Sequence, residues 1–206
     1  DALLQRISDY VKNGGHVVMT FKSGFANENS AVRWVRAPGP LRQAAGFSYQ
    51  EFSNLEKPLA LKGDPFHVGA SDNQVKYWAE FLMPEHAKVL ATYDHPFFGK
   101  WPAITENRYG SGTLIYEGTS VSDALQLALI KRAVDEAGLA SSDKQIPAAV
   151  HVAHGVNRMG KKLHYYFNYS SDEQKASYNY AAGTNLLDGK PVTHGQLLNL
   201  APWDLA

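Results

Sequence analysis

The chain of 206 residues contains no cysteine, no excess charge of either sign and no long apolar run. The absence of cysteine excludes disulfides, thiolate zinc sites, iron–sulfur clusters and a cysteine nucleophile. Basic and acidic residues number 20 each, so the zero net charge predicts neither a nucleic-acid partner nor an anionic membrane surface. Without a run of eighteen apolar residues, the sequence predicts no membrane-spanning helix. The compartment stays open at this point, with the cytoplasm favoured.

Two helix-and-strand pairs are predicted within the first 140 residues, which indicates a layered α/β domain. They are a helix over 3–11 followed by a strand over 16–21, and a strand over 113–117 followed by a helix that ends at Gly138. Ser120 and Asp123 form a capping-box-like start for the second helix. Its apolar positions form two adjacent stripes, so we expect a well-buried helix.

The segment between these pairs is rich in strand signals, and a different pattern follows it. Extended runs lie at 47–52, 75–82, 88–93 and 103–109, with a hairpin turn at 109–112, so the predicted sheet is mixed. Residues 140–148 are polar, carry a proline and indicate a linker. The sequence therefore predicts an α/β domain over 1–140 and a small antiparallel all-β domain over 147–206.

The stretch GGHVVMTFKSGF, at 14–25, has the shape of a strand that ends in a nucleophile-bearing turn. No sequence neighbour supplies Ser23 with a base and an orienting acid, so a tight turn is favoured. His151 and His154 point to opposite faces of a strand, and the other histidines are scattered, so we expect neither a metal site nor a cofactor. Strand-borne glutamates are also present, but base rates favour no catalytic pair among them. These are Glu51, Glu80, Glu106 and Glu117.

Two aromatic segments are candidates for contact with other molecules. The first is YDHPFFGKWP, at 93–102, which contains Phe97, Phe98 and Trp101. It fits a hydrophobic plug folded back on the sheet, a protein interface or a sugar-stacking surface. The second is RWVRAPG, in which Arg33 and Trp34 fit an interface or an ordinary stacking pair.

Long segments across the whole chain resemble the C-terminal half of glycoside hydrolase family 42 β-galactosidases. These segments are YVKNGGHVVMTFKSGFANEN, RAPGPLRQAAGFSYQEF, KGDPF, YDHPFFGKWPAITENRYGSGTLIYEGT, HGVNRMGKKLHYYFNYS, GKPV and LAPWDLA. The resemblance implies a trimerisation domain similar to class I glutamine amidotransferases, with a flavodoxin-like layered fold, followed by a C-terminal β-domain. It also implies that a catalytic (β/α)8 barrel carries both catalytic glutamates outside this sequence, and that strands preceding Ala2 are missing.

In glutamine amidotransferases the strand before the turn ends at the nucleophilic cysteine, which aligns here with Phe21 or Lys22. The resemblance therefore implies a degenerate nucleophile position and no catalytic residue in this chain. Its role would be homotrimer assembly and support of the barrel in a β-galactosidase acting on terminal β-D-galactosyl residues, and the chain alone would be inactive. Arg33, Trp34, Phe97, Phe98 and Trp101 remain the candidates for interface or sugar contact.

Two other functions stay open on the sequence. One is an independent amidotransferase-like enzyme with an altered site around the turn. The other is a carbohydrate-binding module that uses the aromatic loop or the tyrosines of the β-domain. Those tyrosines are Tyr165, Tyr166, Tyr178 and Tyr180.

Overall fold

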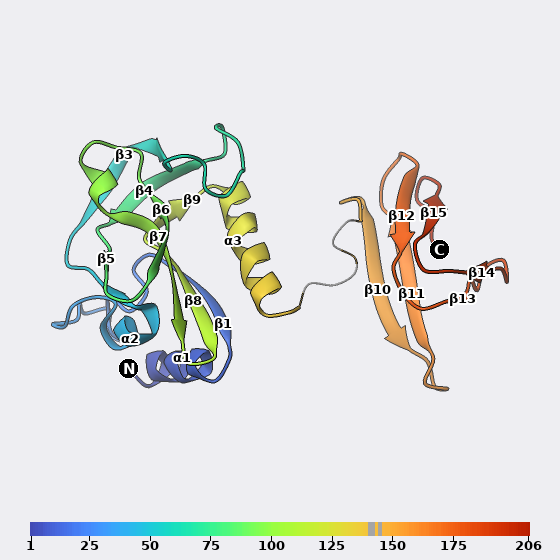
Figure 1. Ribbon diagram of the computed structural model, residues 1–206, viewed down its shortest axis with the longest axis horizontal. Coiled ribbons are helices and arrows are strands. Elements are labelled where there is room, and N and C mark those ends of the chain that lie inside the picture. Colours follow the sequence, from blue (N-terminus) through green and yellow to red (C-terminus); the bar gives the residue numbers. More distant parts are fainter. Residues whose placement is uncertain (140–142, 144–145) are drawn as a thin grey trace. The chain divides into compact units, whose positions relative to one another are not determined.

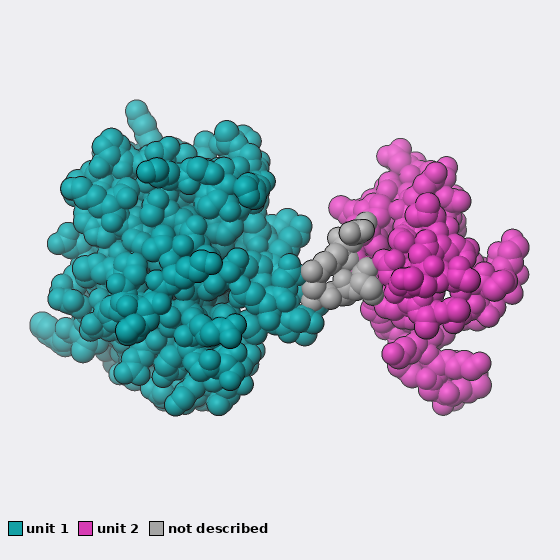
Figure 2. Space-filling view, in the orientation of Figure 1, with its two compact units in different colours: residues 1–139 teal, residues 140–206 magenta. Residues whose placement is uncertain are grey.

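The protein divides into two compact units in the structure, which is a computed structural model (Figure 1; Figure 2). Unit 1 comprises residues 1–139 and unit 2 residues 140–206. The structure describes residues 1–139, 143 and 146–206. Part of the linker predicted over 140–148 therefore lies outside the described residues.

Unit 1 combines short helices with several sheets (Figure 1). Its elements are α1 (Ala2–Lys12), β1 (His16–Thr20), the 3-10 helix η1 (Gly39–Leu41), α2 (Arg42–Ala45), β2 (Phe47–Ser48), β3 (Phe52–Ala60), β4 (Gln74–Glu80), β5 (Met83–Pro84), β6 (Lys88–Thr92), the 3-10 helix η2 (Phe98–Lys100), β7 (Pro102–Tyr109), β8 (Gly112–Glu117), β9 (Thr119–Val121) and α3 (Asp123–Glu136). None of the described helices is both long and apolar enough to cross a bilayer.

A four-stranded mixed sheet with the order β1-β8-β7-β6 lies at the centre of unit 1. β1 runs parallel to β8, from His16 opposite Thr113 to Thr20 opposite Glu117. β7 pairs antiparallel with both β8 and β6. The parallel pair beside antiparallel pairs confirms the mixed α/β class that the sequence predicts.

Helices cover both faces of this sheet because apolar side chains alternate along its strands. On β8, Tyr116 packs with Val11 of α1 and Ala44 of α2 on one face. Ile115 packs with Leu125 of α3 on the other face. Every residue of β8 is buried, as expected for a strand between two helical layers.

The helix α3 differs from its prediction in its cap and in its burial. Ser122 is the N-cap residue, and its Oγ accepts a hydrogen bond from the Leu125 amide at 3.2 Å. Ser120, the predicted cap, lies in β9 instead. The second apolar stripe is exposed, because within unit 1 the helix contacts the sheet along only one side. The exposed fractions are 52% at Leu127, 46% at Ile130 and 38% at Val134.

Two further sheets complete unit 1, with the strand orders β3-β4-β9 and β2-β5. The single strand predicted over 47–52 is divided between β2 and β3. The chain turns between them because the Tyr49 amide donates to the Ala37 carbonyl, and the Glu51 carbonyl accepts from Phe81. This turn gives β3 a new direction toward β4, with which it pairs from Phe52 onward.

In unit 2 the described residues form strands and no helix. These strands are β10 (Val150–Val156), β11 (Lys162–Asn168), β12 (Gln174–Tyr178), β13 (Gly183–Thr184), β14 (Pro191–Val192) and β15 (Gln196–Leu200). β10 pairs with β11, β12 with β15, and β13 with β14, all antiparallel. Val150, Tyr166, Ala176 and Leu200 belong to one buried core.

Candidate functional site

The sharp turn predicted after the first strand is present directly beyond β1. Lys22 has a φ of 63°, in the left-handed region that few residues other than glycine adopt. The Ser23 amide donates to the Thr20 carbonyl at 3.3 Å, and the Phe25 amide to the Lys22 carbonyl at 3.1 Å. We call residues 20–25 the elbow. Its shape is that of a strained strand-end turn of the kind that presents nucleophiles in enzymes.

A buried carboxylate holds the elbow in this conformation. Glu80 Oε1 accepts hydrogen bonds from the Lys22 amide at 2.7 Å and from Trp78 Nε1 at 3.3 Å. Glu80 Oε2 accepts from the Tyr116 hydroxyl at 2.9 Å. Glu80 is fully buried, and burial raises its pKa despite these donors. The three hydrogen-bond donors hold the Glu80 carboxyl group in place, and through the Lys22 amide this group holds the left-handed residue of the elbow.

Tyrosine hydroxyls around the same carboxylate also carry perturbed pKa values. Burial, with a smaller contribution from the Glu80 charge, raises the pKa of Tyr49, Tyr93 and Tyr116. The buried Tyr49 hydroxyl makes no hydrogen bond of standard geometry among the described residues. These tyrosines stay protonated at any physiological pH, so Tyr116 remains a donor to Glu80.

Phe21 and Lys22, the two elbow residues considered for the nucleophile position, pack against an aromatic ring. The Lys22 ammonium lies 3.9 Å from the centre of the Trp78 ring, and Phe21 stacks on the same ring at 6.3 Å. Phe52 covers Trp78 with a ring separation of 4.2 Å. Among the described residues, Ser23 has no hydrogen bond to a histidine. The geometry therefore lacks a nucleophile–base pair.

The chain continues from the elbow into an exposed loop that carries the predicted Arg33 and Trp34. Asn27 organises the start of this loop, because its side-chain oxygen accepts from the Asn29 and Ala31 amides at 3.0 Å each. The Arg33 amide then donates to the Phe25 carbonyl at 3.1 Å, which joins the loop to the elbow. We call residues 26–36 the Trp34 loop.

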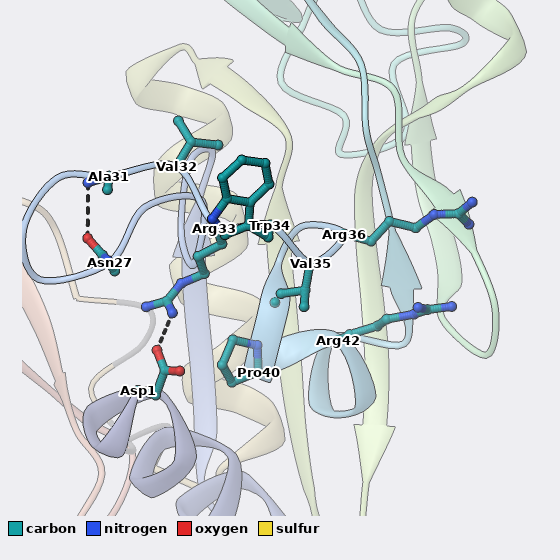
Figure 3. Close-up of a pocket in the computed structure, with 11 residues that line it drawn as sticks. Asp1, Asn27, Ala31, Val32, Arg33, Trp34, Val35, Arg36, Pro40 and Arg42 are labelled. Atoms are coloured by element: carbon teal, nitrogen blue, oxygen red, sulfur yellow. Dashed lines mark hydrogen bonds and ion pairs between the residues drawn. The ribbon is translucent and has the colours of Figure 1, made fainter.

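An open hollow of about 580 Å³ lies beside the Trp34 loop (Figure 3). Trp34 is fully exposed, at 104% of its reference area, and Val32 and Val35 are exposed by 60% and 62%. Figure 3 shows the indole standing away from the helix α2, with Pro40 at the floor of the hollow. These three neighbouring solvent-exposed side chains form an apolar patch, and such patches mark interaction sites.

Three arginines surround the patch and differ in their pairing (Figure 3). Arg33, whose side chain is largely buried, forms an ion pair with the Asp1 carboxylate. Arg42 forms an ion pair with Glu85 at 2.7 Å. Arg36 makes no ion pair among the described residues, so its charge is available to an acidic group of another molecule.

The second aromatic segment is mostly packed into unit 1. Phe81, which is 8% exposed, stacks on Trp101 at 4.4 Å and contacts Phe98 at 5.6 Å. His95 holds the turn, since its Nδ1 accepts from the Phe98 amide at 3.1 Å. Phe97 is 50% exposed. Within residues 1–139, no ring contact joins this segment to Trp34, so the structure separates the two predicted groups.

Sequence reasoning missed the residues that support the elbow. Glu80 and Trp78 lie on β4, which pairs with β3 in a sheet that does not contain β1. Only this tertiary arrangement brings Glu80 to the turn after β1. The alternation of apolar residues along 75–82 predicts the strand, but it gives no sign that a glutamate in it is fully buried. Val32 and Val35 could have been found, because apolar residues so close to Trp34 in an exposed loop belong to the same surface.

The family of the chain follows from comparison with known proteins. The family model described as the β-galactosidase trimerisation domain matches residues 1–140. The chain belongs to this family. The hollow, the Trp34 loop and the elbow all lie within the matched residues.

Relatives of this trimerisation-domain chain are β-galactosidases of much greater length. β-Galactosidase LacA of Lactobacillus acidophilus is 29% identical over 190 residues, which cover 90% of this chain and 27% of that protein. β-Galactosidase BgaA of Clostridium cellulovorans is 28% identical over 198 residues, which cover 94% of this chain and 29% of that protein. The chain thus spans less than a third of the length of these relatives.

Solved structures of β-galactosidases share the fold. The crystal structure of the enzyme from Bacillus circulans sp. alkalophilus matches with a TM-score of 0.78 and 25% identity, over 98% of this chain and 30% of that chain. The enzyme from Rahnella sp. R3 matches with a TM-score of 0.77 and 23% identity, over all of this chain and 30% of that chain.

Proposed function

We propose that this chain assembles the subunits of a homotrimeric β-galactosidase and supports its catalytic barrel. The parent enzyme would hydrolyse terminal β-D-galactosyl residues with glutamates that lie outside this chain, and the chain alone would be inactive. The observation that carries the proposal is the exposed indole of Trp34 in a member of the trimerisation-domain family. We propose the Trp34 loop as the subunit contact.

The chemistry of the patch supports a protein partner. Burying one tryptophan removes about 150–250 Å² from water, which corresponds to about 4–6 kcal/mol at 25 cal/mol per Å². Tryptophan and arginine are also the residues most enriched among interface positions that dominate binding. Because Arg36, at its edge, has no ion-pair partner among the described residues, the patch fits a partner surface that offers an apolar pocket beside a carboxylate.

We propose a different role for the aromatic loop. Phe98 and Trp101 pack on the buried Phe81, which supports the plug interpretation of the segment rather than direct contact with sugar or another subunit. The half-exposed Phe97 is the remaining candidate for contact at this loop.

We also propose that unit 1 has a class I glutamine amidotransferase-like, flavodoxin-like layered fold. The parallel β1–β8 pair and the left-handed Lys22 at the end of β1 support it. Phe21 and Lys22 are packed on Trp78, so an independent amidotransferase activity has no support in the geometry.

Burial removes two of the tyrosines on which a carbohydrate-binding module would depend. Tyr166 and Tyr178, two of the four tyrosines considered for sugar stacking, are only 1% and 9% exposed in the core of unit 2. A ring inside a packed core cannot stack on a sugar without unfolding its surroundings.

The test is the oligomeric state of the complete gene product, measured by analytical ultracentrifugation. We expect Trp34→Ala to weaken subunit association by about 30-fold or more, the equivalent of at least 2 kcal/mol at a dominant interface residue. Trp203→Ala is the matched control, because Trp203 is 69% exposed and lies outside residues 1–140. An unchanged trimer in Trp34→Ala, or dissociation in Phe97→Ala alone, contradicts the assignment of the contact. Turnover of a chromogenic β-galactoside by the isolated chain contradicts the non-catalytic role.

A further inference from the structure

Two histidines face each other across the hairpin of β10 and β11 in unit 2. His154 and His164 are direct partners in the antiparallel register, so their side chains lie on the same face of the pair. The same face carries two buried residues: Val150, four positions before His154 on β10, and Tyr166, two positions after His164 on β11. The pair therefore lies where the buried face reaches the surface, and the His154 side chain is 45% exposed.

The ring nitrogens of the pair are aimed at each other. His154 Nδ1 and His164 Nδ1 are 2.9 Å apart, so one of them donates a hydrogen bond and the other accepts it. Burial, followed by the neighbouring His154, lowers the pKa of His164. The neutral imidazole is the form in which histidine binds metal ions.

Asp143 and Tyr180 fix the orientation of both rings. His154 Nε2 lies 3.0 Å from Asp143 Oδ2, to which the Tyr180 hydroxyl also donates at 2.5 Å. The Tyr180 ring stacks on His164 with a centroid separation of 3.8 Å and an angle of 16°. A carboxylate on the far nitrogen of a histidine is the usual arrangement around metal-binding histidines, because it selects the tautomer and raises the basicity of the other nitrogen.

We propose that His154 and His164 bind a divalent transition-metal ion of the Cu²⁺ or Ni²⁺ class through both Nδ1 atoms, in place of the hydrogen bond between them, with the proton of that bond moving to the far nitrogen of its own ring. Metal–imidazole bonds measure about 2.0–2.1 Å, so two nitrogens 2.9 Å apart subtend an angle of about 90° at the ion. Adjacent positions of a tetragonal ion have this angle, whereas tetrahedral zinc requires a wider one. Among the described residues no three histidine or carboxylate side chains are grouped to hold a metal together, so water completes the coordination.

Competition with protons is built into this site. Besides the two imidazoles, the charged and titratable groups around it are Asp143, Tyr180 and Lys162, with Tyr178 against the His164 ring. Because binding requires both Nδ1 atoms to be free of protons, affinity falls as the pH drops.

The test titrates the intact chain with Cu²⁺ and records calorimetry and pulsed electron paramagnetic resonance. We expect calorimetry to show saturable binding of one Cu²⁺ ion per chain. We expect the pulsed resonance signal to be modulated by the remote nitrogens of two coordinated imidazoles. His154→Gln and His164→Gln each lower the affinity by at least about tenfold, and Asp143→Asn by about tenfold through the histidine it orients. His151→Gln is the matched control, since His151 lies on the opposite face of β10 and pairs with Phe167.

The resonance measurement on the unchanged chain keeps the proposal falsifiable even where a variant folds poorly. A spectrum without two coordinated imidazoles overturns the proposal. Retention of wild-type affinity in a folded His154→Gln or His164→Gln variant also overturns it.

Discussion

The carboxylate of Glu117 is expected to destabilise the folded protein at neutral pH. This residue ends β8, is only 1% exposed and accepts a hydrogen bond from Gln126 Nε2 at 2.8 Å. Burial raises its pKa from 4.5 to about 6. An acid whose pKa is higher in the folded state favours folding while protonated, so stability falls as the pH rises from 4.5 through about 6.

We expect Glu117→Gln to remove this loss. The shift is about 1.5 pH units, which corresponds to about 2 kcal/mol at 1.36 kcal/mol per unit. The glutamine keeps an oxygen that can accept from Gln126, so the variant gains stability over the wild type only where the glutamate is ionised. The difference is close to zero below pH 4.5 and grows to about 2 kcal/mol above pH 6.

Urea unfolding at a series of pH values measures this difference directly. Tryptophan fluorescence reports mainly on unit 1, which holds three of the four tryptophans, including the buried Trp78. Subtracting the two curves cancels every group that titrates alike in both proteins. The reasoning is refuted if the difference in unfolding free energy between variant and wild type does not change with pH. It is also refuted if the variant loses stability relative to wild type as the pH rises.

Glu106→Gln is the control of opposite sign. Burial acts to raise the pKa of Glu106, but hydrogen bonds and charge from Arg132 outweigh it and lower the pKa. The pair is bidentate, at 2.6 Å and 2.9 Å. Its stabilisation is present above the unfolded-state pKa and is lost as the pH falls through the folded one, so this variant is less stable than wild type at neutral pH.

Two further predictions concern the elements around the sheet. Ser122→Ala removes the side-chain N-cap of α3 and should lower the free energy of unfolding by about 1 kcal/mol, with Ser120→Ala unchanged within about 0.5 kcal/mol in the same urea assay. Gly46→Ala should lower it by about 2 kcal/mol or more, because Gly46 has a φ of 71° and a Cβ there would lie 2.5 Å from Asn107 Cγ. Gly63→Ala is the control, because Gly63 is also left-handed but a Cβ there would have no neighbour within 4 Å. If both variants lose the same free energy of unfolding, the clash with Asn107 does not contribute.

Local patterns in the sequence were sufficient for much of the fold. The period of apolar residues located α1, α3 and the strands β6, β7 and β8, and the turn residues at 109–112 located their hairpin. The four-residue α2 was missed, because one turn of helix carries no periodicity. The exposed stripe of α3 was predicted to be buried, since a helical pattern shows which residues are apolar but not how many layers contact them.

The candidate sites depended on contacts between distant segments. Trp34 was a candidate because an arginine–tryptophan cluster in a loop fits an interface, although it fits an ordinary stacking pair equally well. Glu80 under the elbow was invisible, since nothing in β4 indicates that it approaches the end of β1. His154 and His164 were likewise considered apart, because only the register of the hairpin places them opposite each other.

The parallel pairing of β1 with β8 has a consequence for the order of folding. His16 and Thr113 are 97 positions apart, whereas β6, β7 and β8 follow one another along the chain. By loop-closure entropy, the long pairing costs about 3 kcal/mol more to initiate than a two-residue hairpin. We therefore expect a β6–β7–β8 meander to form first and β1 to join it late during synthesis. Since the elbow and the Trp34 loop extend directly from β1, we expect the surface proposed for subunit contact to form only after β8 is made, so that a chain that stops before β8 does not present it to a partner.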